Sequence, residues 1–426
     1  NERGGPRNLA AGRPSFLSFA TAPIDNVRRM LSRIAQRKTG VSLDHELAAG
    51  KTRKGPPMSH WNLRVILPAA FVLMAWALPA TAQEKNAGED KPALSAPEKV
   101  FEELWGVFHQ RYAFFKLRGV DWKKQYEAHR PRVNEKTNDE ELFKILSEML
   151  APLKDGHVTL AIKGKGKEKK KEKKEYCPEE PADFEREFPS RKLQKRFWNM
   201  VAGTLKAAGF SEPRELADIF SYCRNKSFGY LRIAEMEGPG KKALARALDR
   251  ILGDLQDTRG IIIDIRDNPG GTDDFVYRAI SRFADKKRVG HYKKTKKGPG
   301  EDDFSEMKTR YLEPGGDVRY KGYLMLLTHD ASYSAADVFA MLMADLPQAT
   351  LIGDHTNGIF SDMLEKKLSN GWKYSLSHQR YYSSARVCYE GQGIPVDVEI
   401  LNTRADLEKG SDPMITRALE LLSKRL

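Results

Sequence analysis

The sequence lacks the patterns that make most metal and nucleotide sites visible at once. Its 426 residues include only three cysteines, Cys177, Cys223 and Cys388, and their spacing matches no zinc site. It contains neither an HExxH sequence nor a phosphate-binding Walker sequence. We therefore expect no metal and no cofactor. In an exported protein Cys177 and Cys223 could form a disulfide, whereas Cys388 fits a buried strand cysteine better than a nucleophile.

The chain also lacks a hydrophobic run of comfortable membrane-spanning length. The apolar run Val65–Leu78 is too short for this, but it follows Met58 and precedes the small residues at 80–82. This layout predicts a secretory signal peptide at 58–82 and export to the periplasm or the exterior. Residues 1–57 show no sustained periodicity, so we expect an over-extended start there, with a genuine disordered leader as the alternative.

Little net charge is left once two segments are set aside. The formal charge is +14, and residues 1–57 hold 11 Lys and Arg against 4 Asp and Glu. Residues 163–175 hold 8 Lys and 3 Glu, a composition typical of a solvated loop. This loop could make a weak contact with an anionic surface. Because no aromatic residues lie among its lysines, we predict no nucleic-acid binding.

Periodicity divides the remaining chain. Helical spacing from Glu98 and over 138–150 is followed, after the lysine run, by helices expected over 191–208 and 213–222. From Phe228 short apolar strands alternate with amphipathic helices, which is typical of an α/β core with buried parallel strands. The expected divisions are a linker (83–97), a helical N-terminal domain (98–162), a Lys-rich loop (163–175), a helical insertion (176–227), an α/β core (228–402) and a C-terminal helix (403–426).

The most informative residue is Ser334, at a predicted strand-to-helix junction. The apolar run 323–327 predicts a buried strand, and helical spacing begins after Ser334. At such a junction a hydroxyl can project above the sheet, and the free N–H groups of the helix start can face developing negative charge. An acyl-transfer nucleophile needs this position. An ordinary N-cap serine would give the same local pattern.

Other segments supply the groups that such a nucleophile requires. His157 follows an Asp-Gly turn at a strand start and is the best candidate for a base. Glu390, near the end of the core, could orient a histidine. The N–H of Gly270 or Gly271 could bind an oxyanion together with that of Ala335. The simpler alternatives are a capping histidine, a solvated glutamate and a tight Pro-Gly turn.

Taken together, these segments resemble the tail-specific (C-terminal processing) and tricorn-core serine peptidase family. The matching sequences are GYLRI, IIIDIRDNPGG, SYSAADV, ATLIGDHTNG and EGQGIPVDVEI, and the resemblance covers about 98–162 and 228–424. It implies a crotonase/ClpP-like peptidase core with a helical N-terminal domain. It also implies that Ser334 is the nucleophile, with Ala335 and one glycine of 270–271 as the oxyanion hole.

The chain departs from the tail-specific branch at the base. That branch has a lysine in a T-F-G-K-G segment, which corresponds to 356–360 here and places Ile359 where the lysine would be. Isoleucine cannot accept a proton. The resemblance therefore points to the tricorn-like branch, with His157 as base and Glu390 as its partner. A serine that assists the histidine in tricorn would fall at Gly156, so its role is unfilled.

These observations predict an exported serine endopeptidase that acts on protein or peptide substrates through Ser334, His157 and Glu390. One alternative is a non-catalytic binding protein on the same fold, because the interphotoreceptor retinoid-binding proteins resemble this family and also lack the lysine. Another is a peptidase that uses Lys366 or Lys367 as base. No PDZ-like segment is apparent in the sequence between 163 and 227.

Overall fold

The structure is a computed structural model that describes residues 93–162 and 174–425. Residues 95–425 fall within one compact unit. The expected signal peptide at 58–82, the leader at 1–57 and nearly all of the Lys-rich loop lie outside the described residues. Among the helices of the described part, none is both long enough and apolar enough to cross a membrane.

The first described region is helical, as expected. Ser95 and Asn138 begin its two longer helices, each through a capping box with a glutamate three residues later. The first helix starts two residues before the predicted Glu98. Its elements are α2 (Ala96–Arg111), α3 (Trp122–His129), the 3-10 turn η1 (Arg130–Arg132), α4 (Asp139–Leu150) and η2 (Ala151–Leu153).

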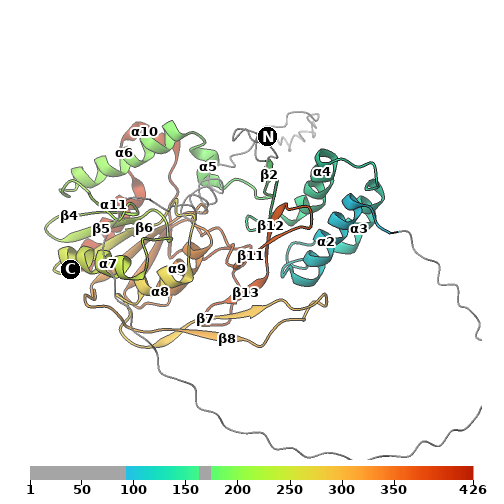
Figure 1. The fold of residues 1–426 in the computed structure, drawn as a ribbon. Helices are drawn as coiled ribbons and strands as arrows, with labels where there is room; N and C mark the ends of the chain where they lie inside the picture. Colours follow the sequence, from blue (N-terminus) through green and yellow to red (C-terminus); the bar gives the residue numbers. More distant parts are fainter. Residues whose placement is uncertain (1–92, 163–173, 426) are drawn as a thin grey trace, which may run out of the picture. The chain divides into compact units, whose positions relative to one another are not determined.

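These helices share a hydrophobic core with a small antiparallel sheet. The sheet has the strand order β11-β12-β1-β2, and Figure 1 shows it beside α2 and α4. Strands from distant parts of the chain therefore meet, because β1 pairs with β12. The four strands are β1 (Thr159–Ile162), β2 (Lys174–Tyr176), β11 (Met363–Lys367) and β12 (Lys373–Ser377).

A seven-stranded sheet forms the α/β core, as predicted, with the order β14-β10-β9-β6-β5-β4-β3. The strands from β14 to β5 are parallel, and β4 and β3 add antiparallel at one edge. They are β3 (Arg214–Leu216), β4 (Phe220–Arg224), β5 (Phe228–Ile233), β6 (Gly260–Asp264), β9 (Tyr323–Thr328), β10 (Ala349–Gly353) and β14 (Val398–Glu399).

Helices cover both faces of this sheet (Figure 1). Ile261 and Ile263 of β6 pack against α7, α8 and α9, whereas Ile262 packs on the opposite side against α6 and α11. Burial on both faces explains why β6 is a continuous apolar run. The helices are α5 (Asp183–Glu187), α6 (Arg191–Ala207), α7 (Lys241–Leu255), α8 (Asp273–Ile280), α9 (Ala335–Ala344), α10 (Arg404–Lys409) and α11 (Pro413–Lys424).

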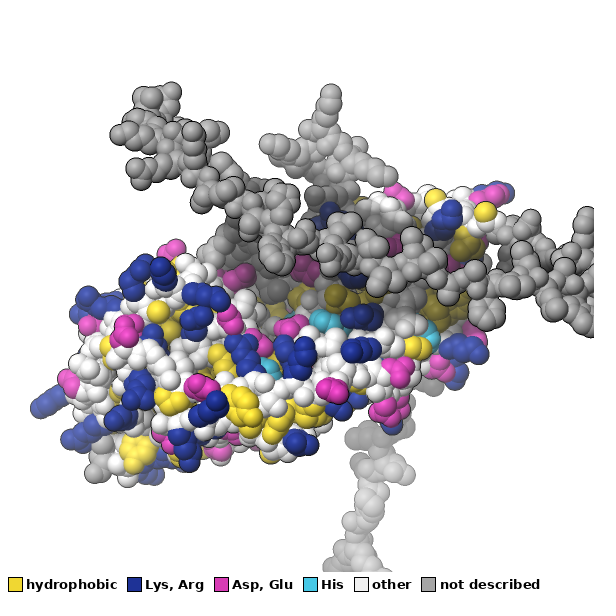
Figure 2. All heavy atoms as spheres, turned by 60° about the horizontal axis from the view of Figure 1, so that its bottom comes forward, with side chains coloured by type: hydrophobic (Ala, Val, Ile, Leu, Met, Phe, Trp, Pro, Cys, Tyr) yellow, Lys and Arg dark blue, Asp and Glu magenta, His cyan; other side chains and the backbone are white. Residues whose placement is uncertain are grey.

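A third sheet has the order β13-β7-β8. Its strands are β7 (Arg288–Thr295), β8 (Lys308–Leu312) and β13 (Gln379–Tyr382). On the face viewed in Figure 2, Lys and Arg side chains are interspersed with Asp, Glu and hydrophobic side chains rather than gathered in one stripe. The expected lack of nucleic-acid binding stays a prediction.

Two expectations for the region before Phe228 are wrong. Residues 213–222 do not form a helix, because β3 and β4 occupy this stretch and β4 pairs with β5. Pairing with the core sheet outweighs the local helix signal of Pro213. The proposed disulfide is also absent, since Cys177 and Cys223 are both free thiols, as is Cys388.

Candidate active site

Ser334 lies where β9 has turned into α9, in a backbone conformation that serine rarely adopts. Its φ is 62° and its ψ is −119°, and its side chain is partly exposed. A non-glycine residue held in such a region costs about 1–3 kcal/mol and persists only when its surroundings enforce it. Here Ser332 Oγ donates to Ile265 O at 2.7 Å, and Tyr333 N–H donates to Asn268 O at 3.2 Å. The junction is thus a strained turn that these two hydrogen bonds hold in place.

Asp337, one turn into α9, ties this junction to the loop at 356–359. Its buried carboxylate accepts the N–H groups of Gly358 at 2.7 Å and Ile359 at 3.2 Å, and the main chain of Ser334 also bonds to it. Burial raises the pKa of Asp337 to about 7, although these donors work to lower it. The sequence analysis missed this residue. It could have been found as an acidic residue three positions after Ser334, from where its side chain can reach back to the N-cap backbone.

The imidazole of His157 lies beside Ser334. His157 Nε2 is 3.2 Å from Ser334 Oγ, although the two residues are 177 positions apart in the chain. That distance is at the outer limit of hydrogen-bond reach for a general base. Burial lowers the pKa of His157, while Asp155, Asp362 and the main chain of Ser361 oppose the shift. The imidazole is therefore neutral, and able to accept a proton, to a lower pH than an exposed histidine.

Asp155 holds the backbone that carries His157. Its fully buried carboxylate accepts the N–H of His157 at 2.9 Å, the hydroxyl of Tyr112 at 2.9 Å and that of Ser377 at 3.1 Å. Three donors from α2's end, the histidine loop and β12 thus converge on one acid. Asp155 was also missed in the sequence, where only its place two residues before His157 pointed to it.

Glu390 is not joined to the imidazole. Its side chain is 1% exposed, so it is not a solvated turn residue. Oε2 accepts the N–H of Phe360 at 2.9 Å, and Oε1 lies 3.9 Å from Arg118 Nη2. Burial, followed by the nearby Asp155, raises the pKa of Glu390 well above its usual value. Among the described residues no hydrogen bond links Glu390 to His157, so the structure brings together only the serine and the histidine.

Gly270 makes the close approach that the junction requires. Its φ is 86°, and a Cβ at this position would lie 2.6 Å from Tyr333 O, 2.7 Å from Ser334 Cβ and 2.8 Å from Ala335 N. Any larger residue would therefore push into the turn that carries the hydroxyl. The turn after β6 and the start of α9 are packed backbone to backbone.

The two glycines differ in the N–H groups that they offer. Gly270 N–H donates to Asn268 Oδ1 at 2.8 Å and is thereby engaged. For the N–H groups of Gly271 and Ala335, the described part of the chain supplies no hydrogen-bond acceptor. Of the alternatives left open by the sequence, Gly271 is therefore the better partner for Ala335 in binding an oxyanion.

The lysine alternatives do not reach the nucleophile. Ile359 is buried, and Lys366 and Lys367 are exposed on β11. Within residues 93–162 and 174–425, neither lysine forms a hydrogen bond or ion pair with Ser334. Of the candidate bases that the sequence offered, the imidazole of His157 is the one that contacts the hydroxyl of Ser334.

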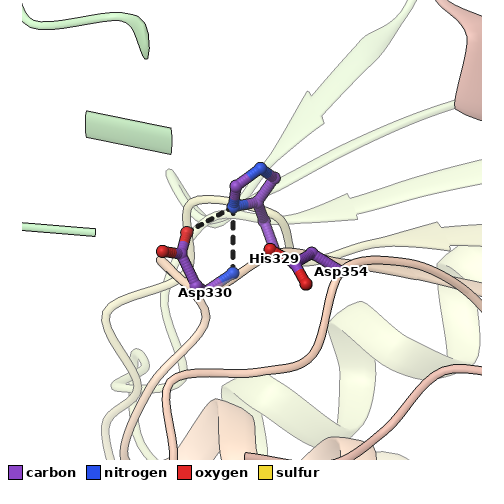
Figure 3. A group of neighbouring side chains, drawn as sticks. All are labelled: His329, Asp330 and Asp354. Atoms are coloured by element: carbon purple, nitrogen blue, oxygen red, sulfur yellow. Dashed lines mark hydrogen bonds and ion pairs between the residues drawn. The ribbon is translucent and has the colours of Figure 1, made fainter. Parts of the chain in front are cut away.

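A cluster of His329, Asp330 and Asp354 places three ligand-type atoms within 4.8 Å of one another. Figure 3 shows the His329 ring facing the Asp330 carboxylate. The Asp330 carboxylate also accepts the first N–H groups of α5, among them Phe184 at 3.2 Å, and Asp354 accepts the N–H of His355 at 2.7 Å. Through these hydrogen bonds the cluster links the start of α5 to the loop before Ser334. The expectation of no metal stays a prediction.

Two segments of the chain match models of known protein families. Residues 227–400 match the model of peptidase family S41, and residues 96–151 match that of the tricorn protease C1 domain. Residues 227–400 thus form a peptidase family S41 domain, and the two matches together support the tail-specific and tricorn-like family that the sequence analysis expected. His157 lies between the two matched ranges, so neither match by itself includes the approach of its imidazole to Ser334.

Relatives with curated names are carboxyl-terminal processing proteases. The protein of that name from Synechocystis sp. is 25% identical over 206 residues, which cover 46% of this chain and 44% of the relative. The carboxy-terminal processing protease CtpA of Bacillus subtilis is 22% identical over 181 residues, covering 42% and 36% respectively. The chain thus spans less than half the length of these relatives.

Solved structures share the fold. A putative peptidase from Parabacteroides merdae is 29% identical with a TM-score of 0.64, and the match covers 77% of this chain and 97% of that one. Mature CPAF matches over 77% of this chain and 96% of its own with a TM-score of 0.56 and 13% identity, which is a likeness of fold alone. The α/β core with a helical N-terminal region is thereby confirmed.

Proposed function

We propose that this protein is a serine endopeptidase that hydrolyses peptide bonds of proteins, with Ser334 as nucleophile and His157 as general base. The observation that carries the proposal is the 3.2 Å approach of His157 Nε2 to Ser334 Oγ. Family membership and the names of the relatives support the same reaction. Substrates are protein or peptide chains, in keeping with carboxyl-terminal processing by the relatives.

The reaction follows from the geometry. His157 Nε2 takes the Ser334 hydroxyl proton as Oγ bonds to the scissile carbonyl carbon, and the oxyanion accepts the N–H groups of Gly271 and Ala335. The C–N bond then breaks, and the leaving amine takes the proton from His157. A water gives a proton to His157 and attacks the ester carbon. Cleavage of the C–Oγ bond returns the proton to Ser334 and releases the second product.

Two finer parts of the proposal concern Glu390 and location. Glu390 stays in the proposed catalytic set, but it acts from a buried position without direct contact with the imidazole, whereas Asp155 holds the histidine backbone. Export rests on the signal-peptide pattern of residues 58–82. A weak anionic-surface contact through the Lys-rich loop at 163–175 remains a proposal on composition alone.

Cleavage of an unfolded protein tests the proposal. We expect the full chain to cut casein, and mass spectrometry of the new termini to show whether cuts gather near the substrate's C-terminus.

The pH dependence of the cleavage rate should also reflect the burial of the imidazole. Because burial lowers the pKa of His157, kcat/KM should reach half of its plateau below pH 6.5, the ordinary histidine value, and fall at more acidic pH as the base is protonated.

A serine-inactivated sample, pretreated with a fluorophosphonate, is the control for contaminating metalloproteases. Absence of cleavage at every pH by a folded chain would favour the non-catalytic binding protein instead. A half-maximal pH above 6.5 would show that another group is the base.

A further inference from the structure

A buried group of charges behind His157 includes a residue from the helical N-terminal region. Arg118 lies in the loop between α2 and α3, and its side chain is 16% exposed. Leu117 next to it faces Gly391, where an added Cβ would lie 3.7 Å from the leucine. The loop that carries Arg118 therefore packs directly on the turn that carries Glu390.

Arg118 is linked to both carboxylates of this group. Its Nη2 is 3.9 Å from Glu390 Oε1, and it bonds to Tyr112, whose hydroxyl donates to Asp155 Oδ2 at 2.9 Å. Although burial works to lower it, the pKa of Arg118 is raised by Asp155, by Tyr112 and by Glu390. Asp155 in turn holds His157 N–H at 2.9 Å. A continuous set of contacts thus runs from the guanidinium to the catalytic histidine.

Several atoms of this group have no hydrogen-bond partner in the described part of the chain. They are Arg118 Nε and Nη2, Glu390 Oε1 and His157 Nδ1, all of them buried. Burying the carboxylates of Asp155 and Glu390 in one group is costly unless a cation compensates them. Arg118 is a cation next to both acids, since despite burial its pKa is raised by Asp155 and by Glu390, whereas Asp362 forms an ion pair with Lys293 at 3.0 Å.

We propose that Arg118 is a positioning residue for His157: it holds the buried carboxylates of Glu390 and, through Tyr112, of Asp155 in place, and Asp155 fixes the backbone of the histidine, so that the N-terminal helical region completes the active site. The inference rests on the proposed peptidase function. The contact between Arg118 and Glu390 links the region that matches the tricorn C1 model, 96–151, to the region that matches family S41, 227–400. Arg118 acts on the position of His157 through Tyr112 and Asp155, with Glu390 as its second acidic neighbour, and it does not touch the substrate.

Arg118→Met should lower kcat by about 10- to 100-fold and leave KM nearly unchanged, because it disturbs the base rather than substrate binding. Arg118→Lys, which keeps the charge, should recover part of the loss. Glu390→Gln should lower kcat similarly, and adding Arg118→Met to it should cause little further loss, since both remove one interaction.

Arg130→Met is the matched control. Arg130 lies in the same helical region with its side chain 19% exposed, and it pairs with Glu98 at 2.8 Å and Glu102 at 2.6 Å, but it belongs to no contact with His157 or Glu390. We expect this variant to lower the melting temperature and to keep kcat.

Wild-type kcat in Arg118→Met, or losses that add fully in the double variant, would overturn the inference while leaving the peptidase proposal intact. If Arg118→Met does not fold, Arg118→Lys and Glu390→Gln carry the same comparison, and an unaltered kcat in both overturns it. An inactive wild type would instead reject the peptidase function itself.

Discussion

Ser334→Ala should lower kcat for casein cleavage by about 10⁴-fold or more, and His157→Ala should be nearly as damaging. The two side chains share one hydrogen bond of 3.2 Å, so each is of little use without the other. The double variant should therefore be no slower than the worse single variant. Melting temperatures should stay close to wild type for Ser334→Ala, because its side chain is partly exposed and accepts no capping hydrogen bond.

Ser423→Ala provides the control for the serine substitution. Ser423 is exposed near the end of α11, where its hydroxyl only donates to Leu419 O at 2.8 Å. Its activity should equal that of the wild type. Losses in Ser334→Ala and His157→Ala that multiply in the double variant would show that the residues act separately, which would contradict the nucleophile–base pairing.

Gly270→Ala should be the most damaging change outside the catalytic pair. The added methyl group would lie within 2.8 Å of Tyr333 O, Ser334 Cβ and Ala335 N, and the φ of 86° disfavours any residue with a Cβ. Moving the turn displaces both the hydroxyl and the Ala335 N–H that would bind the oxyanion. We expect kcat/KM to fall by about 10²-fold or more, with a loss of stability of more than about 1 kcal/mol.

Gly253→Ala separates strain at this turn from the general effect of replacing a glycine. Gly253 lies inside α7, and a Cβ there would meet nothing within 4 Å. This variant should be as stable as the wild type or up to about 1 kcal/mol more stable, with unchanged activity. Kinetics and chemical denaturation of the two variants side by side check the comparison. Equal activity in both would rule out the close approach of Gly270 to the nucleophile turn.

Much of the core could be predicted because its signals are local. The buried run of β9, the junction at Ser334 and the Asp412 cap of α11 each lie within a few residues of sequence. The prediction of a helix over residues 213–222 failed because β3 and β4 are short, and their conformation depends on strand pairing with β5 rather than on local preference.

The site was predictable only in part, for a related reason. Ser334 and His157 have recognisable local settings, and in the structure His157 Nε2 lies 3.2 Å from Ser334 Oγ. The partner of Glu390 is decided by the packing of the Arg118 loop and by the N–H of Phe360, neither of which sequence spacing reveals. The choice between Gly270 and Gly271 likewise depends on the side chain of Asn268, which engages the first glycine.

Labelling with a fluorophosphonate tests the central claim most directly, because this reagent bonds covalently to a serine hydroxyl only where a base activates it. Intact-mass measurement and peptide mapping of the folded chain should show one adduct, on Ser334, and His157→Ala should slow its formation by orders of magnitude. A folded protein with no adduct at Ser334, or with labelling that is equally fast in His157→Ala, would contradict the account.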